Sequence, residues 1–180
     1  MEKRETGVVV VTGGGLGARD INDAIVEIAP KLLAKGCSLY HVTGKGQFAA
    51  VEAKAPQHVD YHLVPFVYKD MARVLGAADV VISRASATFL QELAALEKPS
   101  IIIPSSSLGD QVKNAELYLK SGAAVVLHDE DLARPTSLLK AIVKITTDEQ
   151  FASTLSQKIA ALAKPDAAKD TAQLILEARK

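Results

Sequence analysis

The sequence has little of what several classes of protein require. Cys37 is the single cysteine among 180 residues, so no disulfide can form within the chain and no cysteine-based metal site exists, as is typical of the reducing cytoplasm. Tryptophan is absent and aromatic residues make up only 4%, which argues against a platform for stacking nucleic-acid bases. The 21 basic and 21 acidic residues cancel, so no net field attracts nucleic acid. We expect no nucleic-acid partner.

Long apolar runs are also missing. The longest span about five residues, whereas roughly 20 are needed to cross a bilayer. Residues 1–6 form a charged leader that runs directly into an apolar segment, unlike a signal peptide. We therefore expect a cytoplasmic protein that contacts a membrane only indirectly, through a partner or another domain.

Short apolar runs alternate with longer amphipathic stretches. Residues 8–11 are four valines without polar alternation, which indicates a strand buried on both faces. Further strands are expected at residues 38–42, 59–64, 79–83, 100–103 and 123–127. Helices are expected from residue 18 and at residues 47–55, 69–76, 87–96, 110–121, 135–145, 148–163 and 167–178. Pro30 should kink or divide the first helix, because it has no N–H to donate. The alternation predicts one α/β, Rossmann-like domain over residues 1–180, with a mostly parallel six-stranded sheet flanked by helices.

A glycine-rich loop follows the first expected strand, at the sheet edge where ligands bind in such folds. Residues 12–18 read Thr-Gly-Gly-Gly-Leu-Gly-Ala, and glycines there let helix-start amides approach a phosphate. The loop also fits a relaxed dinucleotide fingerprint, so an NAD(P)-binding domain is an alternative. The second strand, however, ends in Thr-Gly-Lys-Gly, and the next carboxylate is Glu52, whereas NAD sites place an acidic residue at that strand end. A tight turn without any ligand is the third interpretation.

A second loop, at residues 83–88, combines small residues with hydroxyls before another expected helix. Its amides, together with Ser86 and Thr88, suit a phosphate. Glu92 follows about one turn into the helix, where its carboxylate can reach a sugar diol beside that phosphate. The alternative is that Ser86 caps the helix and Glu92 is a carboxylate favoured near the helix N-terminus. Taken alone, the second loop favours this alternative.

Five segments in order make the chain resemble the C-terminal half of MurG-like glycosyltransferases, which have the GT-B fold of two Rossmann-like domains and belong to family 28. Residues 83–92 are similar to the family pattern Ser-Arg-Ala-Gly-Ala-x-Thr-x-x-Glu. The other similar segments are residues 13–22, 41–46, 65–71 and 110–115. They resemble Gly-Gly-Ser-x-Gly-Ala-Arg-x-x-Asn, His-x-Ser/Thr-Gly-Lys-Gly, Phe-Ile-x-x-Met and His-Gln-x-x-Asn-Ala. Two departures are Ser86 in place of the family's second Gly and Asp110 in place of a commoner His.

The resemblance implies a set of nucleotide-sugar contacts. Glu92 is expected to hold the ribose hydroxyls of UDP, and the backbone of Val67, beside Phe66, to read the uracil edge. Asp110 and Gln111 are expected at the GlcNAc ring, and the two amide-rich turns at the diphosphate. The complete set of implied contacts is Gly14, Gly15, Leu16, Phe66, Val67, Ser86, Ala87, Thr88, Glu92, Asp110 and Gln111. Asn114 is expected to fix its loop.

The implied activity is inverting transfer of GlcNAc from UDP-GlcNAc to a lipid-linked muramyl-pentapeptide in peptidoglycan synthesis, without a metal or other cofactor. The acceptor site and the catalytic base belong to the family's N-terminal domain, so this chain is expected to bind the donor without turnover and to carry no catalytic residue. The helix within residues 165–180 is expected to pack against that domain. The complete enzyme is expected to be peripheral to the inner face of the membrane.

Other interpretations are a free-standing UDP-sugar-binding subunit of a two-component glycosyltransferase and a fragment of a UDP-GlcNAc 2-epimerase. Residues 129–131 read Asp-Glu-Asp, which resembles a metal-binding Asp-x-Asp, but we expect a helix cap or a solvated turn. The four histidines lack the spacing of metal ligands. Among them, His41 lies nearest to the expected ligand loops, although ligand contact is the less favoured interpretation.

Overall fold

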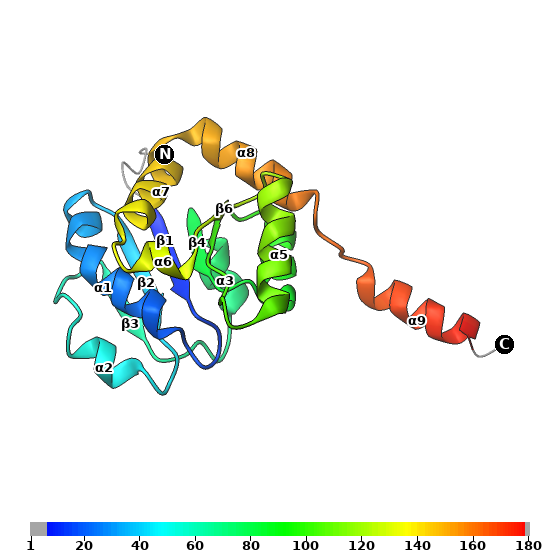
Figure 1. Ribbon diagram of the computed structural model, residues 1–180, viewed down its shortest axis with the longest axis horizontal. Helices are drawn as coiled ribbons and strands as arrows, with labels where there is room; N and C mark the ends of the chain where they lie inside the picture. The colour runs from blue at the N-terminus through cyan, green and yellow to red at the C-terminus, as the bar shows by residue number, and fades with distance from the viewer. Residues whose placement is uncertain (1–6, 179–180) are drawn as a thin grey trace.

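The computed structural model describes residues 7–178; the charged leader at residues 1–6 lies outside this range. Six strands form one parallel sheet in the order β3-β2-β1-β4-β5-β6 (Figure 1). They are β1 (Val8–Thr12), β2 (Ser38–Val42), β3 (Tyr61–Val64), β4 (Val80–Ser83), β5 (Ser100–Ile102) and β6 (Val125–Val126). The prediction of a mostly parallel six-stranded sheet is therefore confirmed.

The helices are α1 (Arg19–Ala34), α2 (Phe48–Glu52), α3 (Met71–Gly76), α4 (Ala87–Ala95), α5 (Gly109–Lys120), α6 (Asp129–Leu132), α7 (Thr136–Thr147), α8 (Glu149–Ala160) and α9 (Ala167–Ala178). Apolar side chains of α1, α6 and α7 pack in one core cluster against one face of the sheet. Those of α3, α4 and α5 pack in a second cluster on the other face. Helix α8 contributes Leu155 to the first cluster and Ile159 to the second.

Strand β1 shows why its valine run predicted a strand buried on both faces. Val9 and Val11 belong to the core cluster under α1, whereas Val10 belongs to the cluster under α4, and all three are at most 1% exposed. Successive side chains of a strand point to opposite faces. A strand covered by helices on both sides therefore needs apolar residues at every position.

Two of the differences from the expectation have a plain structural cause. Helix α1 runs through Pro30 without division; Pro30 is exposed, so the carbonyl that its missing N–H would have bonded can be hydrated instead. Strand β3 begins at Tyr61, because Tyr61 N–H closes a turn onto the carbonyl of His58, and Val59 is left 82% exposed.

Helix α9 lies apart from the rest of the structure, at the end of an extended segment (Figure 1). None of its residues is buried, and Leu174, Ile175 and Leu176 are each about two-thirds exposed. Within residues 7–178, no helix is long and apolar enough to span a membrane.

Candidate functional site

A cavity of about 430 Å³ lies at the carboxyl ends of the strands. Strands β1 and β4 are neighbours in the sheet, and their last residues, Thr12 and Ser83, are in register. The strand order reverses between these two strands, which is where ligands bind in open α/β sheets. The loops after β1 and β4 therefore meet, and both line the cavity.

The glycine loop after β1 is held by its own backbone and by the turn after β2. Gly17 N–H donates to the carbonyl of Gly14, and both residues have positive φ. A Cβ on Gly17 would lie 2.0 Å from the carbonyl oxygen of Thr43, whereas a Cβ on Gly14 would meet no atom within 4 Å. Gly17 thus allows close packing of two backbones, and Gly14 leaves open space at the cavity.

The turn after β4 presents the N-terminus of α4 to the same cavity. Ser86 is the N-cap residue, but its side chain makes no capping hydrogen bond and instead contacts the hydroxyl of Thr88 at 3.2 Å. The alternative in which the Ser86 side chain caps the helix is therefore not what the structure shows. Asn114 donates to the carbonyl of Ala85 at 3.0 Å and so fixes the β4–α4 turn from the α5 side, consistent with the loop-fixing role expected of it.

Aromatic and amide side chains complete the wall. The rings of Phe66 and Tyr68 meet edge to face with centroids 5.0 Å apart, and Lys45 Nζ lies 5.3 Å and 4.6 Å from these two centroids. Gln111 accepts a hydrogen bond from the N–H of Ser105 through Oε1. Its side-chain NH₂ group remains available to donate.

Most of the contacts expected from the sequence line this cavity, namely Gly14, Gly15, Phe66, Val67, Ser86, Thr88, Glu92 and Gln111. Leu16, Ala87 and Asp110 are not among the lining residues, although each lies on one of the same loops or on the first turn of the following helix. The remaining lining residues were not among the contacts expected from the sequence; they are Thr12, Gly13, Val42, Met71, Ser83, Arg84 and Phe89. Thr12 and Ser83 could have been found as the last residues of paired strands.

The acidic segment after β6 has two separate structural roles. Asp131 accepts from the N–H of His128 at 2.8 Å in a capping box, as expected for a helix cap. Asp129, whose side chain is 25% exposed, pairs with Arg84 at 2.7 Å and accepts from the N–H of Ser106 at 2.9 Å, a role that the sequence did not indicate. Among the residues that the structure describes, no cluster of three or more His, Cys, Asp or Glu could hold a metal.

The electrostatics of the cavity favour an anion through backbone groups. Glu92 and Arg84 are the charged residues that line it, and the charge of Arg84 is paired with Asp20 and Asp129. Helix α4 begins at the cavity, which its Thr88 and Glu92 line, and a helix N-terminus offers N–H groups without intrahelical partners and the positive end of the dipole. On the other side the cavity is lined by the backbone of the glycine loop that leads into α1.

Residues 8–171 match the glycosyltransferase family 28 C-terminal domain. The chain belongs to this family. The chain is similar to the UDP-N-acetylglucosamine–N-acetylmuramyl-(pentapeptide) pyrophosphoryl-undecaprenol N-acetylglucosamine transferase of an Exiguobacterium species, with 38% identity over 94% of the chain and 47% of that protein. The enzyme of the same name from Gloeobacter violaceus is 35% identical over 96% of the chain and 48% of its own length. The chain thus spans about half the length of these curated relatives.

Solved structures of a glycosyltransferase and of an epimerase share the fold of this family 28 domain. MurG of Acinetobacter baumannii superposes with a TM-score of 0.82 at 23% identity, over 98% of this chain and 54% of that one. The UDP-GlcNAc 2-epimerase of Neisseria meningitidis, solved with UDP-GlcNAc bound, has a TM-score of 0.64 at 12% identity, over 97% of this chain and 45% of that one. At these identities, the likeness establishes the fold alone.

Proposed function

We propose that this domain binds UDP-GlcNAc as the donor half of an inverting N-acetylglucosaminyltransferase. The observation that carries the proposal is the meeting of two amide-rich turns at one cavity that also contains the carboxylate of Glu92. Membership of family 28 and the names of the curated relatives support a nucleotide sugar as the ligand. They also favour UDP-GlcNAc over NAD(P), because they name a transfer of N-acetylglucosamine and no transfer of hydride.

Within the cavity, the proposed pose follows the chemistry of each wall. Glu92 accepts hydrogen bonds from the two ribose hydroxyls. The backbone of Val67 pairs with the edge of uracil, and Phe66 packs beside the base. The diphosphate lies between the amide-rich turns, and the GlcNAc ring extends towards Asp110 and Gln111 at the start of α5.

The diphosphate is held by the backbone of Gly14 and Gly15 on one side and by Ala87 and Thr88 at the start of α4 on the other. Leu16, 90% exposed, lies at the rim of this site. Oriented N–H groups and helix N-termini stabilise negative charge without reorganising. The residues at the diphosphate therefore suit binding without a metal ion.

The reaction that we propose for the complete enzyme is attack by an acceptor hydroxyl on the anomeric carbon of GlcNAc as UDP departs. Charge then grows on the diphosphate, where the amides stabilise it. The acceptor is the lipid-linked muramyl pentapeptide named in the curated relatives. The acceptor site and the base lie in the other half of the protein. The isolated domain binds the donor without turnover, and membrane contact on the cytoplasmic face is made through that other half.

Helix α9 is proposed to pack against the acceptor-binding half. Its Leu174, Ile175 and Leu176 are exposed, and an apolar helix surface of this kind is characteristic of an interface. The curated relatives have about twice the length of this chain, so such a half exists in this family.

Two related arrangements use the same donor site. In a two-component glycosyltransferase the acceptor half is a separate chain, and co-purification of that chain would identify this arrangement. In a UDP-GlcNAc 2-epimerase the fold is shared, and epimerisation by the complete protein would identify it. Both arrangements retain a nucleotide sugar in the cavity.

Calorimetric titration with UDP tests the donor site. We expect binding by the wild-type chain and an affinity at least about tenfold lower in Glu92→Ala, because hydrogen bonds to a charged group contribute about 1.5–3 kcal/mol. Glu116→Ala is the matched control, since Glu116 lies on the exposed side of α5 and pairs with Lys120. Absence of UDP binding, or equal affinity in Glu92→Ala and the control, contradicts the proposal.

A further inference from the structure

Arg84 lies where three loops of the cavity meet. Its Nη2 donates to Asp20 Oδ2 at 2.8 Å, and its Nη1 donates to Asp129 Oδ1 at 2.7 Å and to the carbonyl of Ile103 at 3.2 Å. Asp20 belongs to the first turn of α1, just after the glycine loop, and Ile103 directly follows β5. One guanidinium thus joins the β4–α4 turn to its neighbours on both sides in the sheet.

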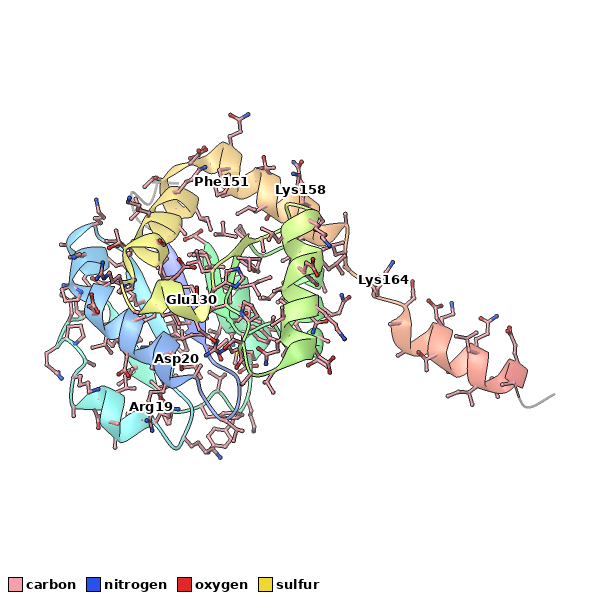
Figure 2. The ribbon with its side chains drawn as sticks, in the orientation of Figure 1. Arg19, Asp20, Glu130, Phe151, Lys158 and Lys164 are labelled. Atoms are coloured by element: carbon pink, nitrogen blue, oxygen red, sulfur yellow. The ribbon has the colours of Figure 1, made fainter. Side chains whose placement is uncertain are left out.

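Asp129 extends this connection to the loop before α5. Its Oδ1 accepts from Arg84, and its Oδ2 accepts from the N–H of Ser106 at 2.9 Å. The adjacent Ser105 N–H donates to Gln111 Oε1 at 3.1 Å, so two successive amides of the loop are held, one by Asp129 and one by α5. Figure 2 shows Asp20 on α1 facing the short helix α6, which begins at Asp129 and carries Glu130.

Although Arg84 lines the cavity, its contacts engage its charge with the protein. Its side chain is only 12% exposed, and the carboxylates of Asp20 and Asp129 set two negative charges against its single positive charge. Partial burial raises the pKa of Asp129, but hydrogen bonds from Arg84 and Ser106 lower it by more, so the pKa stays below its usual value. Asp129 is therefore ionised at neutral pH and remains paired with Arg84.

We propose that Arg84 is a positioning residue, which sets the spacing of the three loops through Asp20 and Asp129 and does not itself contact the donor. The proposal rests on the function proposed above, in which the cavity holds the diphosphate of UDP. An arginine beside a diphosphate is commonly a direct phosphate ligand. The two roles predict opposite effects when Asp129 is changed.

Asp129→Asn separates the two roles. Arg84 and Ser106 donate to different oxygens of the Asp129 carboxylate, and asparagine replaces one of these oxygens by an NH₂ group that cannot accept. One of the two contacts is therefore lost, so we expect the β5–α5 loop to loosen and UDP affinity to fall about tenfold. Affinity for uridine, which lacks phosphate, is expected to stay within about twofold, because the base site at residues 65–67 is not part of this network. Glu130→Gln, which removes a charge from an exposed position of the same helix, is the matched control and should change neither affinity.

Together with Asp129→Asn, the variants Arg84→Ala and Arg84→Ala/Asp129→Asn complete a double-mutant cycle. If the two residues act as one unit, the double variant binds UDP no more weakly than the weaker single variant. If the Arg84→Ala variant does not fold, Asp20→Asn and Asp129→Asn still test the network. A direct phosphate role is shown, and the positioning role overturned, if Asp129→Asn binds UDP as tightly as the wild type or more tightly while Arg84→Ala binds it more weakly.

Hydrogen exchange in the absence of ligand tests the positioning role of Arg84 separately from the proposed binding of UDP. A positioning role predicts that the amides of Ser105 and Ser106 exchange at least about tenfold faster in Asp129→Asn than in Glu130→Gln, while the amides of β1 and β4 exchange at the wild-type rate. Equal exchange at Ser105 and Ser106 overturns the positioning role even if UDP binds. Absence of UDP binding by the wild-type chain contradicts the proposed function instead.

Discussion

His41 Nε2 lies 2.9 Å from Asn22 Oδ1, and this contact defines the protonation of a fully buried histidine. The NH₂ group of Asn22 donates to the carbonyl of Thr43 at 3.0 Å, so its oxygen faces the imidazole and His41 must donate from Nε2. The other ring nitrogen, 2.8 Å from the hydroxyl of Tyr61, then accepts. His41 is therefore neutral, with its proton on Nε2.

This buried network supports the glycine loop from behind. Asn22 also donates to the side chain of Gln47, so α1 holds both ends of the turn after β2. Gly17 packs against that turn at Thr43 and Gly44. His41, with 0% exposure, positions the loop and does not line the cavity.

We expect His41→Ala to lower the free energy of unfolding by about 2–4 kcal/mol, because it leaves the buried oxygen of Asn22 and the hydroxyl of Tyr61 without partners and opens a cavity. Urea denaturation measures the change. His62→Ala is the control, since His62 is exposed on the adjacent strand β3 and its replacement should alter stability by less than about 0.5 kcal/mol. Equal losses in the two variants would contradict the role of the network.

Stability should also fall as the pH is lowered from about 6.5 to about 4. Burial lowers the pKa of His41 from 6.5 to about 4, so the unfolded chain binds a proton in this range that the folded chain does not. The unfolded state is thereby favoured, by about 3 kcal/mol at the acid end. Urea titrations across this range measure the effect. His41→Gln should lack this component, and an unchanged pH slope in that variant would refute the assignment.

The packing of Gly17 against the β2–α2 turn predicts a strong effect of one methyl group. In Gly17→Ala the new Cβ would lie 2.0 Å from the carbonyl oxygen of Thr43, at a φ of +78°, so the loop must shift. We expect a loss of about 2–4 kcal/mol in stability and weaker UDP binding. Gly46→Ala, where a Cβ meets no atom within 4 Å, is the control. Thermal unfolding measures the stability, and calorimetry measures the affinity for UDP. Equal stability and equal affinity in the two variants would contradict this packing.

Sugar recognition is expected to depend on Gln111. Its Oε1 is held by the backbone of Ser105 while its side chain lines the cavity, so the NH₂ group can donate to a sugar hydroxyl. Gln111→Ala should lower the affinity for UDP-GlcNAc about tenfold more than that for UDP. Asp110→Ala should show the same preference more weakly, because Asp110 is not among the lining residues. Competition titrations with the two ligands measure the ratio, and equal losses for both ligands would exclude a sugar contact.

Removal of residues 165–180 should leave the domain intact. No residue of α9 is buried, whereas Lys164, which the shortened chain keeps, donates its N–H to Gln91 on α4. We expect the free energy of unfolding and the affinity for UDP to stay within about 0.5 kcal/mol of the wild-type values. A clear fall in either quantity would show that α9 stabilises this domain. It would contradict the proposal that the apolar side chains of α9 pack against the acceptor-binding half.

Much of the fold could be predicted because its signals are local. The valines of β1 indicated burial on both faces, and the glycines of residues 13–17 indicated a backbone open to a ligand. The residue at which a strand begins was less predictable. Val59 has a strand-like side chain but lies outside β3, because the turn between His58 and Tyr61 determines where pairing begins.

The alternation of apolar and amphipathic segments predicted the six strands and most of the helices along the chain, and with them the edge of the sheet at which the glycine loop and Glu92 lie. The pairing of the charges and buried polar groups is visible in the folded structure alone. Arg84 is 64 residues from Asp20 and 45 from Asp129, and His41 is 19 from Asn22. Periodicity reports which face of an element is buried, but the partner of a polar group depends on how distant elements pack, and no local pattern encodes that.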